Sequence, residues 1–167
     1  LRNATADLDS APPAADVVVA GWTPETMDPP TMELLLRRDD LRLRFLDPTS
    51  AMLWPAGGGL LVRPTVLPFD GGLQSVLDLS AAETRAGDGY VLYSLPAQPE
   101  PGWLGAPVTF SGGIRLEGYQ FQPVTGGALL VTVWRAAGPV VEPLRVFVHM
   151  LASDGSIAGQ HDGLGAP

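Results

Sequence analysis

The sequence predicts an α+β, mainly β fold, in which a small α/β layer precedes an antiparallel, jelly-roll-like β-sandwich. Three observations predict this class. The 167 residues include 20 glycines and 17 prolines, which break the chain into short elements. Hydrophobic residues make up 46%, enough to build a core. The order of elements also changes, from mixed helices and strands to strands alone, after a proline-rich stretch.

Composition divides the chain into four regions. Residues 1–15 are small and polar, and we expect a flexible arm or linker there. Residues 16–95 form the predicted small α/β region. The stretch "PAQPEPGWLGAP", residues 96–107, is a proline-rich connector with little capacity for regular structure. Residues 108–167 form the predicted β-sandwich region, which we expect to be incomplete.

The first elements of the α/β region carry clear local signals. "DVVVAGW", from Asp16, is a short apolar strand. "DPPTMELLLRR" is the predicted helix that follows. In it Asp28 is placed to cap the first turn, Pro29 needs no hydrogen-bond acceptor there, and Arg37 and Arg38 complement the helix dipole at the far end.

The rest of this region continues the strand and helix alternation. "LRLRFLD" alternates apolar residues with Arg42 and Arg44, as a half-buried strand does. A second helix is predicted in "GGLQSVLDLSAAE". Further strands are expected in "AMLWPAGGG", "LLVRP" and "YVLYSL". This order indicates a reduced doubly wound sheet. The glycines at 56–61 lack the spacing of a phosphate loop and favour a hairpin turn.

Beyond the connector every segment has strand character. The predicted strands are "VTFSGGIRLEGYQFQP", "GALLVTVWRA", "PLRVFVHMLA" and "SIAGQHD". In the first, Ile114 and Leu116 share one face, but the apolar parity then moves to Tyr119 and Phe121, so a bulge is expected at Gly118. "ALLVTVW" is apolar on both faces, which predicts a central strand covered on both sides.

Charge and composition exclude several function classes. The 10 basic residues are all arginine, against 18 acidic ones, and the net charge of −8 makes nucleic acid an improbable partner. The absence of cysteine removes thiol chemistry and disulfides. No apolar run approaches the about 20 residues of a membrane-spanning helix. No cofactor is expected.

The segment "VFVHMLASDGSIAGQHDG" holds both histidines and predicts a hairpin that turns at Ser153 to Gly155. A three-residue loop would put Phe147, His149 and His161 on one face, whereas a two-residue loop would separate the histidines. In this hairpin Val146, Val148 and Met150 share a parity and are expected in the core. His149 would then lie beside Phe147 and Leu151 on the other face, as a structural histidine with one hydrogen bond.

Metal and enzyme sites have weak support. Asp154 and Asp162 are the candidate calcium ligands, but their spacing matches no known loop, so no metal is expected. Neither a nucleophile elbow nor a pair of carboxylates at plausible positions for glycoside hydrolysis is evident. We therefore expect no catalytic residue in this chain.

Aromatic residues offer a binding alternative, because flat rings stack on the apolar faces of sugars. Trp103, Tyr119 and Trp134 lie in or near the β region with polar residues between them. The competing interpretation is that Trp134 and Phe121 belong to the core, while Trp103 in the connector has the better prospect of exposure. The full set of candidate ligand-binding residues is Trp103, Tyr119, Trp134, His149, His161 and Asp162.

The series "VTFSGGIRLEGYQF", "GGALLVTVWRA" and "LRVFVHMLASDGSIAGQHDG" resembles the extracytoplasmic C-terminal region of bacterial membrane glycosyltransferases. These are the enzymes similar to dolichyl-phosphate-mannose protein mannosyltransferases, family 39-like and of the Chloroflexota type. The resemblance runs from Val108 to Gly163, and the upstream "LRLRFLDPTSAMLWPAGGG" is similar to the α/β segment that precedes that region. The family's catalytic acids belong to the membrane part, so none is carried over.

The resemblance implies a non-catalytic, extracytoplasmic accessory domain, tethered to the membrane through its parent enzyme, that binds or positions a glycan acceptor. Its partners would be a glycan or cell-envelope component and the membrane part of its parent chain. We expect this chain to be a fragment, with further sandwich strands beyond Pro167. The alternative is a structural or protein-interaction β-sandwich module of a secreted or cell-envelope protein, without sugar affinity.

Overall fold

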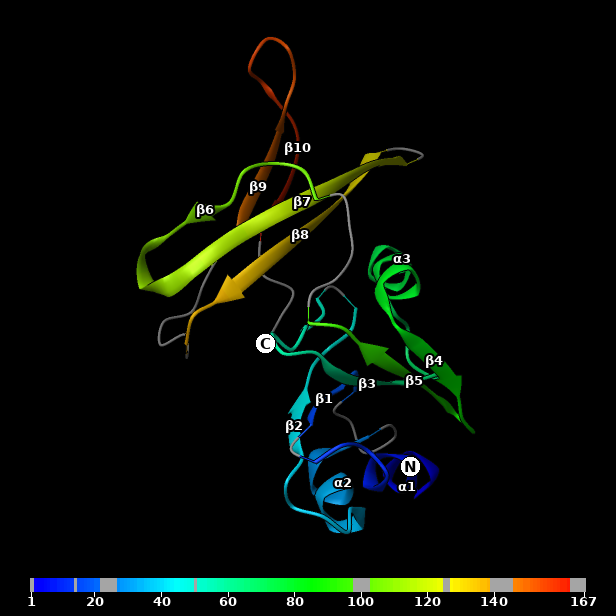
Figure 1. The fold of residues 1–167 in the computed structure, drawn as a ribbon. Helices are drawn as coiled ribbons and strands as arrows, with labels where there is room; N and C mark the ends of the chain where they lie inside the picture. Colours follow the sequence, from blue (N-terminus) through cyan, green and yellow to red (C-terminus); the bar gives the residue numbers. More distant parts are fainter. Residues whose placement is uncertain are drawn as a thin grey trace. The chain divides into compact units, whose positions relative to one another are not determined.

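The computed structural model of the chain (Figure 1) describes residues 2–13, 15–21, 27–49, 51–97, 103–124, 127–138 and 146–162, without the side chains of Val124, His161 and Asp162. The chain divides into two compact units, one built mainly from Leu1–Pro101 and the other from Gly102–Leu164. We call them the α/β unit and the β unit. The division between them lies inside the proline-rich stretch at 96–107.

The α/β unit is built on one five-stranded sheet of order β2-β1-β3-β5-β4. Strand β1 pairs in parallel with both β2 and β3, whereas β3, β5 and β4 pair antiparallel. The strands are β1 (Asp16–Val19), β2 (Arg42–Phe45), β3 (Gly59–Pro64), β4 (Glu83–Ala86) and β5 (Tyr90–Leu95). Strands predicted in "DVVVAGW", "LRLRFLD", "LLVRP" and "YVLYSL" are therefore present.

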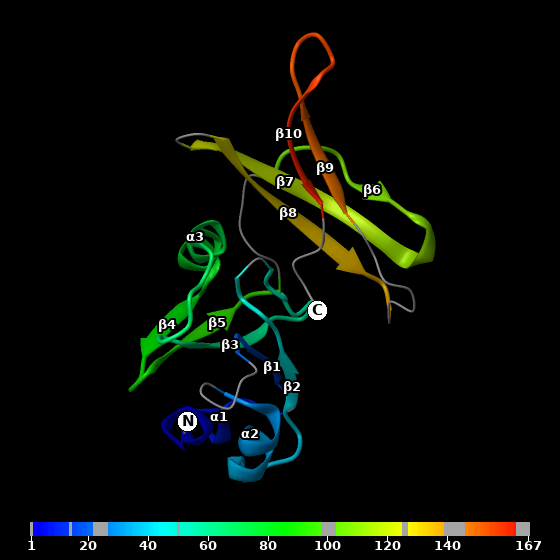
Figure 2. The ribbon, with the colours of Figure 1, turned by 180° about the vertical axis from the view of Figure 1, so that it is seen from behind.

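The central strand β1 is apolar on both faces because helices cover both faces of the sheet (Figures 1 and 2). Val17 and Val19 pack with residues of α1 (Arg2–Asp9) and α2 (Pro29–Leu35) on one side. Val18 and Ala20 pack with Leu77 of α3 (Gly71–Ser80) on the other. Both predicted helices are present.

Two aspartates fix the starts of α2 and α3. The Asp28 carboxylate accepts hydrogen bonds from the Thr31 backbone N–H at 3.1 Å and from its hydroxyl at 2.8 Å. The Asp70 carboxylate accepts from the N–H groups of Gly72 and Leu73 at 2.9 and 3.0 Å. These bonds satisfy backbone donors that a helix start leaves without partners.

The N-terminal segment differs from the arm expected over residues 1–15, because Arg2–Asp9 forms α1 with Ala4 and Leu8 buried in the core. Of the two arginines expected to complement the end of α2, Arg38 instead complements the end of α1. Helix α2 ends at Leu35, and Arg38 donates to the carbonyl oxygens of Ala11 at 2.5 Å and Pro12 at 3.4 Å, just past the end of α1.

Two further expectations in this unit were wrong. Residues 51–58 form no strand, although one was expected in "AMLWPAGGG". The glycine segment is therefore not a hairpin turn. It is a turn closed by a hydrogen bond from the Gly58 N–H to the Pro55 carbonyl, and it leads into β3. Trp54 in this segment is instead held by a bond from its indole Nε1–H to the Pro96 carbonyl at 2.7 Å. Strand β4 was not predicted, because all its residues are exposed and carry no periodic apolar signal.

A polar contact ties α1 to the edge of the sheet. The buried Tyr90 hydroxyl donates to the Asp7 carboxylate, which also pairs with Arg85 at 2.5 Å. Burial, and then the hydrogen bond to Asp7, raise the pKa of Tyr90 to about 12. Gly87 is required beside this ring, since a Cβ there would lie 2.2 Å from the Tyr90 Cζ atom.

The β unit contains a three-stranded antiparallel sheet, β6-β7-β8, and a two-stranded sheet, β9-β10. The strands are β6 (Val108–Thr109), β7 (Ile114–Val124), β8 (Gly127–Ala136), β9 (Phe147–Leu151) and β10 (Ile157–Asp162), with a short 3-10 helix at Ser111–Gly113. The predicted α+β, mainly β class is confirmed. Face-to-face packing of two sheets, and with it the jelly-roll-like sandwich, stays a prediction.

Candidate functional site

The β6-β7-β8 sheet carries one face that is rich in aromatic residues. Directly opposed residues in antiparallel strands project to the same face. The opposed pairs Leu116 with Trp134, Tyr119 with Thr132 and Phe121 with Leu130 share this face. Leu104 extends it at the edge through its bridge to Tyr119, and Val108 through its pairing with Leu116. The Phe110 ring reaches it by packing on the Trp134 ring, with centroids 5.7 Å apart.

A bulge produces this alignment, as the sequence predicted. The register between β7 and β8 shifts between Leu116 and Gly118, so Glu117 is the additional residue. Without that residue, Leu116 and Tyr119 would point to opposite faces. The bulge therefore brings the apolar residues before and after it onto one surface, which we call the aromatic face: Leu104, Val108, Phe110, Ile114, Leu116, Tyr119, Phe121, Leu130, Thr132 and Trp134.

Much of the aromatic face is exposed. The exposed fractions are 48% for Phe110, 37% for Tyr119 and 47% for Phe121. Trp134 is half-buried, and its indole Nε1–H donates to the Thr132 hydroxyl at 2.9 Å. Ile114 is the one residue of the set that is classed as buried, at 7% exposed. The aromatic face thus combines exposed rings with two hydroxyl groups, of Tyr119 and Thr132, and none of its members carries a charge.

The charged residues of this sheet lie on the opposite face. Arg115 and Arg135 are directly opposed, an arrangement that is unfavourable for like charges. The bulge residue Glu117 pairs with both of them, at 3.2 and 2.7 Å. The bulge therefore neutralises an arginine pair on one face while it aligns the aromatic residues on the other.

Trp103 lies against the bulge. A Cβ at Gly118 would lie 2.8 Å from the Trp103 Cβ and 3.0 Å from the Leu104 carbonyl oxygen, so only glycine admits this close approach. Reciprocal backbone hydrogen bonds, at 2.7 and 3.1 Å, join Leu104 and Tyr119. Trp103 is half-buried, so it is less exposed than its place in the connector suggested.

The histidine hairpin has the predicted loop but a different register. The Ala152 N–H donates to the Ser156 carbonyl and the Gly155 N–H to the Ala152 carbonyl, which encloses Ser153 to Gly155 as predicted. A bulge between Ile157 and Gly159 then shifts β10, so that His161 is opposed to Val148 and not to Phe147. Gln160, and not His161, therefore has the same parity as His149 in the backbone register.

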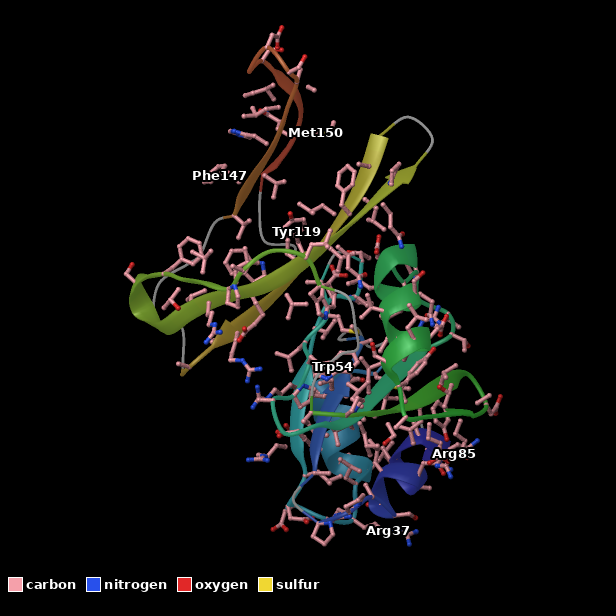
Figure 3. The ribbon with its side chains drawn as sticks, turned by 45° about the horizontal axis from the view of Figure 1, so that its top comes forward. Arg37, Trp54, Arg85, Tyr119, Phe147 and Met150 are labelled. Carbon is pink, nitrogen blue, oxygen red and sulfur yellow. The ribbon has the colours of Figure 1, made fainter. Side chains whose placement is uncertain are left out.

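The predicted environment of His149 was also wrong. Figure 3 shows Phe147 and Met150 on this hairpin, and both are exposed, at 62% and 43%. Val146 and Val148 are half-buried. His149 is exposed, and its side chain makes no hydrogen bond to any described residue. The expected structural hydrogen bond of His149 is thus missing from the part of the chain that the structure describes.

The two candidate calcium ligands lie at opposite ends of β10. Asp154 is in the loop, where its carboxylate accepts from the Ser156 hydroxyl at 2.6 Å and from the Ser156 N–H at 2.9 Å, bonds that lower the pKa of Asp154. Asp162 is opposed to Phe147 at the other end, roughly 20 Å away at strand spacing. One ion cannot bind both, and the described residues contain no group of three His, Asp or Glu side chains suited to a metal.

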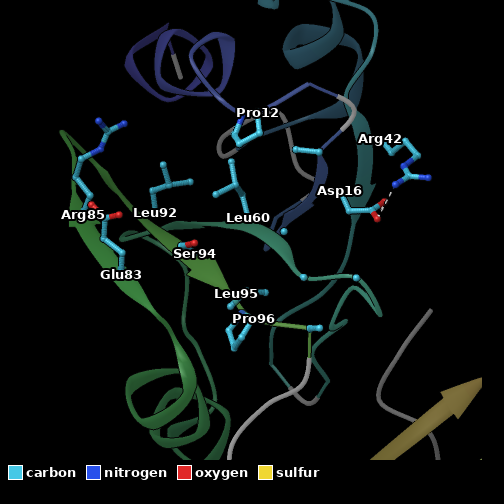
Figure 4. A pocket seen from close by; sticks show the side chains of 15 residues that line it. Pro12, Asp16, Arg42, Leu60, Glu83, Arg85, Leu92, Ser94, Leu95 and Pro96 are labelled. Atoms are coloured by element: carbon cyan, nitrogen blue, oxygen red, sulfur yellow. Dashed lines mark hydrogen bonds and ion pairs between the residues drawn. The ribbon is translucent and has the colours of Figure 1, made fainter.

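The α/β unit contains a groove of about 600 Å³ (Figure 4). Its floor includes Leu60 and Leu92, and its rim includes Asp16, Arg42 and Arg85. Three of its charged groups already have partners, since Arg42 bonds to Asp16 at 3.0 Å and Arg85 to Asp7. The groove also lies at the amino ends of the parallel strands, whereas open α/β sheets bind ligands beyond the carboxyl ends. It is therefore the weaker candidate site.

No family model, curated protein or solved structure matches this chain. No helix among the described residues is long and apolar enough to cross a membrane.

The geometry singles out the aromatic face as the candidate site. It brings Tyr119 and Trp134 of the predicted set together with Leu104, Val108 and Phe110, three residues that were not predicted as site residues from the sequence. Val108 could have been found from its parity with Phe110 in "VTF", but the ring contact from Phe110 to Trp134 has no sequence signal.

Proposed function

We propose that this chain is a non-catalytic binding module, the extracytoplasmic accessory domain of a polytopic membrane glycosyltransferase, and that its aromatic face holds a glycan acceptor. The observation that carries the proposal is the convergence of Phe110, Tyr119, Phe121 and Trp134 on one partly exposed face. Aromatic rings present large, rigid apolar surfaces at low entropic cost. The resemblance over Val108 to Gly163 supports the parent enzyme and the location.

The chemistry of the face favours an uncharged glycan. Its members are apolar or hydroxyl-bearing, while Arg115, Glu117 and Arg135 lie on the opposite face and pair with one another. The chain as a whole carries a net charge of −8, which repels acidic sugars. A neutral oligosaccharide could therefore stack on the rings without displacing an ion pair.

The test is calorimetric titration of the chain with neutral oligosaccharides selected on a glycan array. Phe121→Ala should weaken binding about tenfold, which corresponds to about 1.4 kcal/mol. Phe147→Ala is the matched control, because Phe147 is also an exposed phenylalanine, at 62% against 47% for Phe121, and lies on β9, outside the aromatic face. Loss of binding in both variants, or in neither, would contradict the assignment of the site.

The membrane location requires a separate test. The parent reading frame should encode several apolar helices of about 20 residues before this region. A frame without them would exclude the membrane enzyme and leave the binding surface as a property of another kind of protein.

A structural or protein-interaction module without sugar affinity is the second candidate. The specific observation in its favour is that Leu104 and Val108, at 54% and 46% exposed, lie on the same face, since exposed aliphatic side chains fit a protein surface better than a sugar. An array that shows no sugar binding at millimolar concentration would favour this candidate.

A further inference from the structure

Strand β8 has the composition of a central strand but lies at the edge of its sheet. In "ALLVTVW", residues 128–134, Thr132 is the only polar residue, which predicted a strand with neighbours on both sides. The sheet order is β6-β7-β8, so within the described residues β8 pairs with β7 alone (Figure 1). The backbone N–H and C=O groups of alternate residues along this ten-residue strand are left on its outer side.

Most of the other described sheet edges carry features that block strand addition, and the exception, β9, is five residues long against ten in β8. Strand β2 is four residues long and carries Arg42 and Arg44, and the four-residue β4 carries Glu83 and Arg85. Strand β6 is two residues long, and β10 is interrupted by a bulge. Strand β8 contains no proline, its only charged residue is Arg135 near its end, and the additional residue of its bulge is on β7. Such an edge favours pairing with another strand.

We propose that the free edge of β8 pairs antiparallel with β8 of a second copy of this chain, about a two-fold axis at Thr132. This symmetry aligns each face with the same face of the other copy. It opposes Trp134 to Leu130 of the second copy, and Val133 to Val131. Both pairs join side chains that stabilise neighbouring strands.

Charge favours this surface for a second copy. Two chains of net charge −8 repel each other, and they can approach most readily where acidic residues are absent. Strand β8 has no acidic residue, and the symmetric register places Arg135 opposite Leu129 of the second copy, so the two Arg135 side chains stay apart. The joined sheets would present one continuous aromatic face, although the pairing does not depend on what that face binds.

The test is sedimentation equilibrium of the whole chain. The wild-type chain should dimerise reversibly. Leu129→Lys, which places a second positive charge opposite Arg135 of the other copy, should weaken the dimer at least about tenfold. Leu129→Glu should retain the dimer and tighten it at low salt, because it pairs with that arginine. Gln122→Lys is the matched control: it is opposed to Leu129 on the inner strand β7 and should leave the dimer unchanged.

Amide hydrogen exchange gives a second measurement that needs no substitution. Exchange across residues 128–136 should slow as the chain concentration rises, while exchange in β2 and β4 should not change. A chain that stays monomeric up to several hundred micromolar, or a dimer that Leu129→Lys and Gln122→Lys weaken equally, would overturn the proposal. A dimer without concentration-dependent protection of β8 would overturn it as well.

Discussion

Strands β1 and β8 have similar composition but different surroundings, and the contrast distinguishes the two units. In the α/β unit, Val17, Val18 and Val19 of β1 are fully buried between two strands and two layers of helix. In the β unit, the described residues of β8 have one neighbouring strand and none is buried. Among the described residues, Ile114 is the only buried hydrophobic residue of the β unit. An apolar sequence predicts that a strand is buried, but it does not identify the strands or helices that bury it.

The largest expected effect tests whether the stability of the chain resides in the α/β unit. Leu61→Ala empties a fully buried position on β3 and should lower the free energy of unfolding by about 2–5 kcal/mol. Phe121→Ala, at the exposed aromatic face, should cost less than about 1 kcal/mol. Urea unfolding followed by circular dichroism measures both. Equal losses would mean that the aromatic face is packed as tightly as the core.

The next effect concerns alkaline pH. The pKa of Tyr90 is raised to about 12 in the folded chain, from about 10 when unfolded. The contribution of neutral Tyr90 to the free energy of unfolding is therefore fully present below pH 10. As the pH rises from about 10 to 12, the free energy of unfolding should fall by about 2–3 kcal/mol. Urea unfolding across this range should show the loss in the wild type. Tyr90→Phe should lack this component, whereas Tyr93→Phe, at a buried tyrosine of the same strand, should retain it.

A smaller effect is expected at the bulge of the β unit. Gly118→Ala places a Cβ 2.8 Å from the Trp103 Cβ, so the edge segment must move, at a cost of about 1–3 kcal/mol. Amide exchange at Leu104 and Tyr119, which hydrogen-bond each other, should accelerate. Gly138→Ala is the control, because its Cβ would meet nothing within 4 Å. Unchanged exchange in Gly118→Ala would show that Trp103 does not pack on this sheet.

The smallest effect is expected at His149. If His149 were the structural histidine with one hydrogen bond that the sequence suggested, His149→Ala would cost about 1–3 kcal/mol for the partner left without its bond. The exposed histidine of the structure predicts a change within about 0.5 kcal/mol, and no shift of the melting temperature on addition of zinc or calcium. A metal-dependent rise in melting temperature that His149→Ala abolishes would restore a metal site to this hairpin.

The sequence predicted features that depend on nearby residues better than features that depend on residues distant in the sequence. The Asp28 cap, the bulge at Gly118 and the loop at Ser153 to Gly155 depend on nearby residues, and all three are confirmed. Helix α1 was missed because its moderately polar sequence gains stability from burying Ala4 and Leu8 in a distant core. The register of β10 was missed because its bulge, although it lies beside Gly159, is accompanied by no change of apolar parity of the kind that marks the bulge at Gly118.

The candidate site shows the same division. Tyr119 and Trp134 were selected as aromatic residues, but their convergence depends on cross-strand pairing and on a bulge of one residue. Phe110 joins them through a ring contact with Trp134 of β8, a residue far from it in sequence. His161 and Asp162 were selected because they are polar and close in sequence to a turn, which says nothing of what they face after the register shift.

The central claim, that the aromatic face is the binding surface, is tested most directly by nuclear magnetic resonance of the isotope-labelled chain titrated with a neutral oligosaccharide. The account predicts saturable shifts of the side-chain resonances of Phe110, Tyr119, Phe121 and Trp134, while those of Phe147 and of the groove residues Leu60 and Leu92 stay constant. Saturable shifts confined to the groove or to the β9-β10 hairpin, or no shifts at millimolar sugar, would contradict it.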